Sequence, residues 1–151
     1  MNTIWLDRDT QFMEMALRLA AAQLGKTGEN PAVGCVIVRG DEVVGCGATA
    51  DGGRPHAEAV ALADAGMSAL GATVYVTLEP CAHISIRGES CTKLLLDAQI
   101  SRLICCIEDP DPRTSGQGFM RLRDAGISVE IGLLDSAGRE QIATFTPRLE
   151  R

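Results

Sequence analysis

Two short segments of the sequence carry side chains of the types that bind metals. Residues 55–58 have the sequence PHAE, and residues 77–81 have the sequence TLEPC and are followed by a second cysteine at position 91. One histidine and two cysteines supply three ligands, the number that a catalytic zinc site uses while its fourth position stays open to water. We therefore expect zinc to be bound by His56, Cys81 and Cys91.

Glu58 adds an acid to this set. It lies two residues after His56, where it is placed to move protons to and from a water molecule at the metal. Zinc lowers the pKa of such a water to about 7, so hydroxide is available at neutral pH. The order H-x-E, then Pro-Cys and a further cysteine, is the signature of the zinc deaminases. Glu58 is accordingly predicted to be the catalytic acid and base.

A packing role is the alternative for each of these residues taken singly, since a lone cysteine in a cytosolic chain is usually a small buried hydrophobic side chain. The combination favours metal binding, because the chain has only two histidines, His56 and His83, and both lie in or beside the two segments. Cys105 and Cys106 lie in an apolar stretch and are expected to be structural. Cys35 and Cys46 are also expected to be structural; they can face each other across a predicted hairpin, but a reducing cytosol disfavours a disulfide.

Helices and strands must bring these residues together. Apolar residues at helical spacing predict a first helix that is capped by Asp9 or Thr10 and ends near Leu24. Residues 33–38 and 42–48 form a predicted hairpin. Further helices are predicted at 55–65, 92–98, 117–125 and from 136 onward, and further strands at 73–77, 103–107 and 128–131. Strands alternating with helices after an opening hairpin predict an α/β layer protein with a mixed sheet.

Length and composition limit the remaining possibilities. The chain has 151 residues and 46% hydrophobic residues, which suits one domain over residues 1–151 with a buried core. A net charge of −6 and only 3% aromatic residues argue against nucleic acid as a partner. No apolar run reaches the length of a signal peptide or a membrane span. We therefore expect a cytoplasmic protein with a small-molecule substrate, water as co-substrate and no membrane partner.

Five segments of the chain together point to a known family. They are residues 12–17 (FMEMAL), 30–38 (NPAVGCVIV), 56–58 (HAE), 75–81 (YVTLEPC) and 109–112 (DPDP). Nearly the whole chain resembles the deaminase domain of the bifunctional deaminase/reductase of riboflavin biosynthesis, within the cytidine-deaminase-like superfamily. The wide spacing of the two cysteines and the D-P-x-P segment point to this branch. The resemblance implies a three-layer α/β fold, with helices flanking a mixed central sheet of about five strands.

The resemblance also implies substrate contacts. Asn30 is expected to hydrogen-bond the substrate, and Asp109 and Asp111 are expected to contact it from the DPDP segment, which is DPNP in the family. Arg87 takes the place of the basic residue that contacts the substrate phosphate in the family. His83 is either a further substrate contact or a surface residue.

The loop between the two cysteines departs from the family. Nine residues separate Cys81 from Cys91, whereas the family typically has eight, and residues 88–90 are Gly-Glu-Ser in place of Thr-Pro-Pro. The acids introduced at Glu89 and at Asp111 disfavour a phosphorylated ligand in the same pose by charge repulsion. Glu79, just before Pro-Cys, is expected to brace the turn rather than to take part in catalysis.

Three functions stay open on this evidence. The first is hydrolytic deamination of the diaminohydroxyphosphoribosylaminopyrimidine of riboflavin biosynthesis or a close relative. In this reaction Glu58 takes the water proton, delivers it to a ring nitrogen and then protonates the leaving amine. The second is deamination of another free base or nucleoside, guanine- or cytosine-like, through a remodelled loop. The third is a non-catalytic zinc-stabilised binding domain, which the presence of Glu58 disfavours. A homodimer or larger homo-oligomer is expected, and a separate reductase is a further candidate partner.

Overall fold

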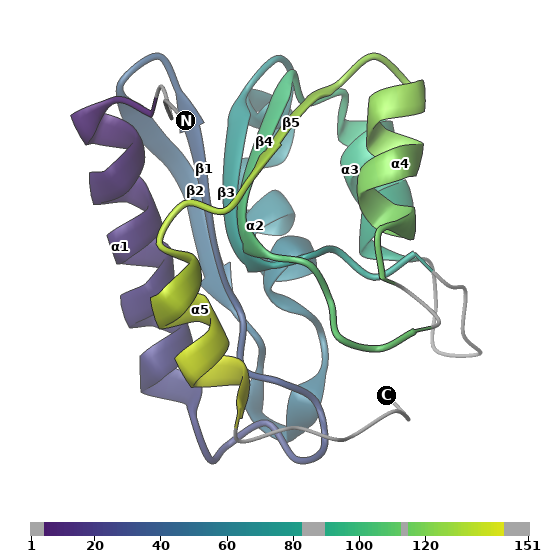
Figure 1. Ribbon diagram of the computed structural model, residues 1–151. Helices are drawn as coiled ribbons and strands as arrows, with labels where there is room; N and C mark the ends of the chain where they lie inside the picture. The colour runs from purple at the N-terminus through teal and green to yellow at the C-terminus, as the bar shows by residue number, and fades with distance from the viewer. Residues whose placement is uncertain (1–4, 83–89, 113–114, 144–151) are drawn as a thin grey trace.

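The computed structural model describes residues 5–82, 90–112 and 115–143 (Figure 1). Its elements are α1 (Asp7–Gln23), β1 (Gly34–Arg39), β2 (Glu42–Ala48), η1 (Asp51–Gly53), α2 (Ala57–Ala65), η2 (Gly66–Ala69), β3 (Thr73–Leu78), α3 (Cys91–Ala98), β4 (Arg102–Ile107), α4 (Gln117–Asp124), β5 (Ser128–Ile131) and α5 (Asp135–Ile142). Apart from the start of α1, the helices and strands predicted from the sequence all lie within two residues of these bounds.

A five-stranded mixed sheet forms the centre of the fold, in the order β2-β1-β3-β4-β5. Strand β1 pairs antiparallel with both β2 and β3, whereas β3, β4 and β5 run parallel to one another. Helix α3 connects β3 to β4 and α4 connects β4 to β5, as parallel neighbours require. The mixed sheet expected from the sequence is therefore confirmed.

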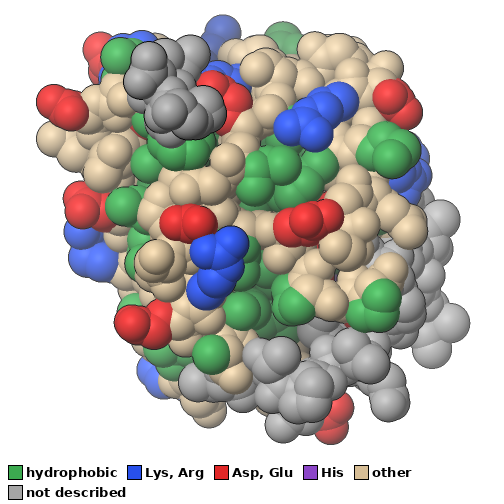
Figure 2. All heavy atoms as spheres, viewed as in Figure 1, with side chains coloured by type: hydrophobic (Ala, Val, Ile, Leu, Met, Phe, Trp, Pro, Cys, Tyr) green, Lys and Arg blue, Asp and Glu red, His purple; other side chains and the backbone are tan. Residues whose placement is uncertain are grey.

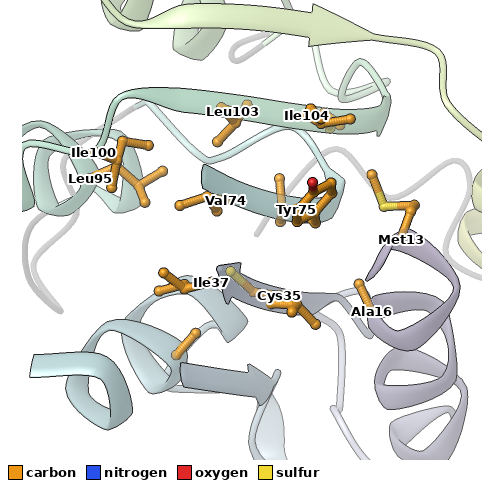
Figure 3. Packing of buried hydrophobic residues seen from close by; sticks show 14 of the residues in the cluster. Met13, Ala16, Cys35, Ile37, Val74, Tyr75, Leu95, Ile100, Leu103 and Ile104 are labelled. Atoms are coloured by element: carbon orange, nitrogen blue, oxygen red, sulfur yellow. The ribbon is translucent and has the colours of Figure 1, made fainter. Parts of the chain in front are cut away.

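Helices cover both faces of this sheet and make the fold three-layered. Helices α1 and α5 lie on one face, and α2, α3 and α4 lie on the other (Figure 1). Tyr75 points toward Met13 of α1, whereas the adjacent Val74 lies on the side of Leu95 in α3 (Figure 3). The alternation of side chains along a strand thus supplies both halves of the core from a single central strand.

Helix α1 approaches the sheet closely because of a glycine in β1. A Cβ atom at Gly34 would lie 1.8 Å from the carbonyl oxygen of Ala16, so no larger residue fits between helix and strand. The predicted cap of this helix is wrong. Helix α1 begins at Asp7, and Asp9 lies inside its first turn, where its Oδ2 accepts a hydrogen bond from the N–H of Leu6 at 3.0 Å. An acid at this position satisfies a free N–H group as well as a preceding cap would.

Cys35 and Cys46, which the predicted hairpin allowed to face each other, are not cross-strand partners. Cys46 pairs with Val36 and Cys35 pairs with Gly47. Since neighbouring residues of a strand face opposite sides of the sheet, Cys35 and Cys46 lie on opposite faces. Both are free thiols, as are the buried Cys105 and Cys106.

The surface agrees with the charge balance of the sequence. On the face seen in Figure 1, acidic and basic side chains lie among apolar and neutral ones, and the coloured atoms form no continuous basic patch (Figure 2). No helix in the described ranges combines the length and apolar character needed to cross a membrane.

Candidate metal centre

The residues singled out in the sequence meet at one edge of the sheet. Because β1 runs antiparallel to β2 and β3, this edge collects the start of β1 and the ends of β2, β3 and β4. Side chains from the segments at these strand ends line a small pocket. Its polar lining consists of Asn30, Thr49, His56, Glu58, Glu79, Cys81 and Asp109.

The three predicted metal ligands form one cluster beside this pocket. Nδ1 of His56 lies 3.8 Å from Sγ of Cys81 and 3.5 Å from Sγ of Cys91. One donor atom from each residue lies within 4.8 Å of the others. Among the described residues, these three side chains are the ones close enough together to bind one metal ion. One nitrogen and two sulfur donors at such separations suit a tetrahedral zinc ion with one position left for water.

Two helix N-termini hold the cluster. His56 is the N-cap of α2 and has an extended backbone, so α2 starts at Ala57 rather than at Pro55. Cys91 is the first residue of α3, which begins one residue earlier than predicted because the hydroxyl of Ser90 accepts the N–H of Lys93 at 3.1 Å. The positive ends of both helix dipoles therefore lie at the cluster and favour thiolate charge there.

Hydrogen bonds prepare Cys81 to act as a thiolate ligand. The N–H of Cys91 donates to Sγ of Cys81 at 3.2 Å. The Cys91 side chain, and then His56, stabilise the charged sulfur and lower the pKa of Cys81 to about 4 despite its burial. The same pairing, together with burial, raises the pKa of Cys91. A cation bound by both sulfurs would favour the deprotonated form of each cysteine.

Glu58 lies in the first turn of α2, two residues from the ligand His56, and is only 4% exposed. Burial raises the pKa of Glu58 to about 7, with His56 opposing the rise and Cys81 adding to it. A carboxyl group with this pKa can both accept and donate a proton near neutral pH. Its place beside the three candidate metal ligands is the place that a general acid and base would need.

Asn30 is oriented by the backbone of the loop that leads to His56. Its side-chain Nδ2 donates to the backbone carbonyl oxygen of Gly53 at 2.8 Å. Its backbone carbonyl oxygen accepts a hydrogen bond from the hydroxyl of Thr27 at 2.5 Å. One of the two amide N–H groups is thus engaged, and the side-chain oxygen is the acceptor that Asn30 offers in the pocket that it lines.

Glu79 occupies the bracing position expected from the sequence. Its carboxylate accepts backbone N–H groups from two later segments of the chain: Asp109 and Gly116 on Oε1, and Gly118 and Phe119 on Oε2, at 3.0–3.4 Å. Burial raises the pKa of this carboxyl, and the four donors act against that rise. Glu79 thus connects the end of β3 to the end of β4 and the start of α4.

The remaining predicted substrate contacts have different outcomes. Asp109 lines the pocket, and its Oδ1 accepts the N–H of Asp111 at 2.8 Å. Asp111 is 1% exposed and is not part of the pocket lining formed by the described residues. His83 and Arg87 lie outside the described residues.

Thr49 is a pocket residue that the sequence did not indicate. It follows β2, and its hydroxyl donates to the carbonyl oxygen of Pro31 at 3.1 Å and accepts the N–H of Val33 at 3.0 Å. The hydroxyl connects the end of β2 to the start of β1. A threonine directly after a predicted strand was the available signal, but only the strand order places this residue at the cluster.

Comparison with known proteins agrees with this geometry. Residues 6–107 match the family described as the cytidine and deoxycytidylate deaminase zinc-binding region. The chain is 44% identical over 144 residues to the riboflavin biosynthesis protein RibD of Haemophilus influenzae, covering 95% of this chain and 38% of that protein. It is 43% identical over 142 residues to RibD of Escherichia coli, covering 94% and 38%. The chain thus spans about two fifths of the length of these relatives.

Solved structures show the same relationship. The fold matches Acinetobacter baumannii RibD with a TM-score of 0.89 and 42% identity, over 94% of this chain and 40% of that one. It matches a diaminohydroxyphosphoribosylaminopyrimidine deaminase/5-amino-6-(5-phosphoribosylamino)uracil reductase of Thermotoga maritima with a TM-score of 0.85 and 34% identity, over 91% and 40%. The chain therefore belongs to the zinc-binding cytidine and deoxycytidylate deaminase family, and it is similar over nearly its whole length to part of the RibD proteins of riboflavin biosynthesis.

Proposed function

We propose that this chain is a zinc-dependent hydrolytic deaminase of an aminopyrimidine. The observation that carries the proposal is the joint placement of Glu58 and the His56–Cys81–Cys91 cluster at one pocket. The cluster offers the ligands of a catalytic zinc site, and Glu58 offers a carboxyl group whose pKa of about 7 suits proton transfer. A purely structural zinc site has four protein ligands and does not require such an acid.

The residues divide the work as follows. Zinc, when bound, lowers the pKa of a water ligand to about 7. Glu58 accepts one proton of the attacking water and delivers it to a ring nitrogen of the substrate. It then takes the second proton from the hydroxyl group newly attached to the ring carbon and passes it to the amine, which leaves as ammonia. Asn30 accepts a hydrogen bond from a substrate N–H or hydroxyl group through its side-chain oxygen. This contact orients the ring so that its amine-bearing carbon faces the water.

The substrate that we propose is the diaminohydroxyphosphoribosylaminopyrimidine of riboflavin biosynthesis. The support is the 34% identity to the Thermotoga maritima protein, which is described as a deaminase of this compound. Arg87 is proposed to bind the phosphate, by its position in the sequence before Cys91.

A second candidate substrate is an unphosphorylated base or nucleoside. The described part of the pocket lining contains three carboxylate side chains, Glu58, Glu79 and Asp109, and no lysine or arginine. Such a lining suits donors on a ring or a ribose better than it suits a phosphate. The phosphate contact of the first candidate therefore depends on Arg87.

Ammonia release separates the two candidates. The phosphorylated pyrimidine, its dephosphorylated analogue, guanine and cytosine are each incubated with the wild type and with Arg87→Ala. The proposal predicts turnover of the phosphorylated compound, a sharp rise of KM in Arg87→Ala, and poor turnover of the analogue. Equal turnover of the phosphorylated and dephosphorylated compounds would favour the second candidate, and no ammonia from any of them would contradict the deaminase assignment.

The wider proposal concerns assembly and pathway. We propose a cytoplasmic homodimer or larger homo-oligomer whose product is consumed by a reductase, since the Thermotoga maritima relative is described as both a deaminase and a reductase. Light scattering coupled to size-exclusion chromatography tests the assembly, and a monomeric mass would contradict it.

A further inference from the structure

The backbone around Cys81 is held by a neighbouring helix. Thr92, which follows Cys91 in α3, is fully buried. Its N–H and its hydroxyl both donate to the carbonyl oxygen of Cys81, at 3.1 and 2.8 Å, and the hydroxyl lies 3.3 Å from the carbonyl oxygen of Pro80. The proposed metal ligand Cys81 is thereby hydrogen-bonded to Thr92, the residue that follows the proposed ligand Cys91.

A second helix holds the following residue. Nη1 of Arg121, in α4, donates to the carbonyl oxygen of Ala82 at 2.6 Å across a sequence separation of 39 residues. Ala82 directly follows Cys81 and is 6% exposed, so this hydrogen bond reaches a buried peptide group. A charged donor makes the bond stronger than one between neutral groups.

Helix α4 is well placed to act as a fixed support. A Cβ atom at Gly118 would lie 2.4 Å from the carbonyl oxygen of Pro80, so the first turn of α4 packs directly against the backbone before Cys81. The N–H groups of Gly118 and Phe119 bind the carboxylate of Glu79. The start of α4 therefore packs on residues 79–80. From the next turn of the same helix, Arg121 binds the carbonyl oxygen of Ala82, two residues further along that segment.

We propose that Arg121 is a positioning residue of the metal centre, which fixes Cys81 through the carbonyl group of Ala82 and so slows the loss of zinc. The inference rests on the proposed function, because it takes the His56–Cys81–Cys91 cluster to bind zinc. Groups that orient metal ligands change metal affinity by about 10–100-fold when they are removed. Arg121 acts through the backbone rather than on a ligand atom, so we expect an effect near the lower end, about tenfold.

The test compares zinc release from Arg121→Ala with that from a matched control on the same helix. Arg123 is also exposed, and its Nη2 also donates to a backbone carbonyl oxygen, that of Val129 at 3.1 Å, but in β5. Zinc-loaded wild type, Arg121→Ala, Arg121→Lys and Arg123→Ala are mixed with an excess of a chromogenic chelator. We expect zinc release about tenfold faster from Arg121→Ala, intermediate from Arg121→Lys and unchanged from Arg123→Ala.

A second measurement distinguishes positioning from loss of stability. The thermal midpoints of chelator-treated Arg121→Ala and Arg123→Ala are expected to agree, because the exposed arginines contribute little to the core. Release from Arg121→Ala at the wild-type rate would overturn the inference, and so would equal acceleration in Arg123→Ala. A wild type that binds no zinc would instead overturn the proposed function on which the inference rests.

Discussion

Two buried acids lie in the first turns of helices on opposite faces of the sheet. Their different surroundings have opposite effects on their pKa values. Asp9 of α1 is 0% exposed and Glu58 of α2 is 4% exposed. Burial acts in the same direction on both carboxyl groups, because it disfavours the charged form. The net effects are nevertheless opposite: the pKa of Asp9 is lowered, and that of Glu58 is raised to about 7.

The partners of Asp9 account for the difference. Burial alone would raise its pKa, but the hydroxyl of Tyr75 donates to Oδ1 at 2.6 Å and the N–H of Leu6 donates to Oδ2. Arg102 lies 3.4 Å from Oδ1 and also pairs with Glu130 at 2.7 Å. These groups keep Asp9 ionised and connect α1 to β3, β4 and β5.

At Glu58 burial dominates, and the charge of Cys81 adds to it. His56 opposes the rise without reversing it. A pKa of about 7 suits proton transfer near neutral pH, whereas the lowered pKa of Asp9 does not. The comparison teaches that donors around the acid of α1 keep it ionised and part of the fold, whereas burial brings the pKa of the acid proposed for proton transfer close to neutral pH.

The largest expected effect is on catalysis. Glu58→Gln keeps the size of the side chain but removes its ability to carry a proton, so we expect kcat to fall by about 10²–10⁴-fold. Zinc content should not change, because Glu58 is not a member of the ligand cluster. Ammonia release and elemental analysis on the same sample check both statements. Turnover close to that of the wild type would remove Glu58 from the mechanism.

The corresponding change at Asp9 should affect stability and leave catalysis intact. Asp9→Ala leaves Tyr75 and Arg102 without their shared acceptor. Breaking a buried ion pair costs about 3–5 kcal/mol, and since the Arg102 side chain is 28% exposed we expect about 3 kcal/mol. Urea unfolding measures this loss. A reduced kcat in folded Asp9→Ala would break the division between the two acids.

The two acids should also give opposite pH dependences of stability. The lowered pKa of Asp9 means that its contribution is complete above its unfolded value of 3.8 and is lost as the pH falls through the folded value. The raised pKa of Glu58 destabilises the fold as the pH rises from 4.5 to about 7. In chelator-treated protein, Glu58→Gln should therefore gain stability over the wild type across that interval, whereas Asp9→Asn should lose its disadvantage only in acid. Parallel pH profiles for the two variants would contradict the comparison.

The smallest effect is expected at the residue before Asp9. Arg8 pairs with Asp41 at 2.6 Å, but their side chains are 52% and 78% exposed. Exposed ion pairs contribute about 0–1 kcal/mol. Arg8→Ala should therefore unfold within 1 kcal/mol of the wild type, and a loss as large as that of Asp9→Ala would show that burial is not what separates them.

Much of the fold was predictable because it depends on local pattern. The alternation of strands and helices follows from periodicity, and the ligands follow from the few residue types that bind zinc. The start of α1 differs from the prediction because neither Asp9 nor Thr10 precedes the helix. Asp9 accepts the N–H of Leu6 from within the first turn. Propensity ranks the residue types at a helix start but does not distinguish these two positions.

Contacts between distant segments were not predictable from the sequence. The hydrogen bond from Arg121 to Ala82 and the place of Thr49 in the pocket both depend on which strands are neighbours. Asp111 is buried outside the described pocket lining, so its substrate contact, which the motif indicates, stays a prediction. Residue type indicates a chemical capacity, and only the tertiary structure decides where that capacity is used.

The metal content of the purified protein tests the central claim most directly. Elemental analysis should find one zinc per chain in the wild type. It should find the same in the control variant Cys46→Ala, because the thiol of Cys46 lies outside the ligand cluster. Cys91→Ala should lose most of this zinc, because it removes one of three ligands. A wild type without zinc, or a Cys91→Ala variant that keeps one zinc per chain, would contradict the account.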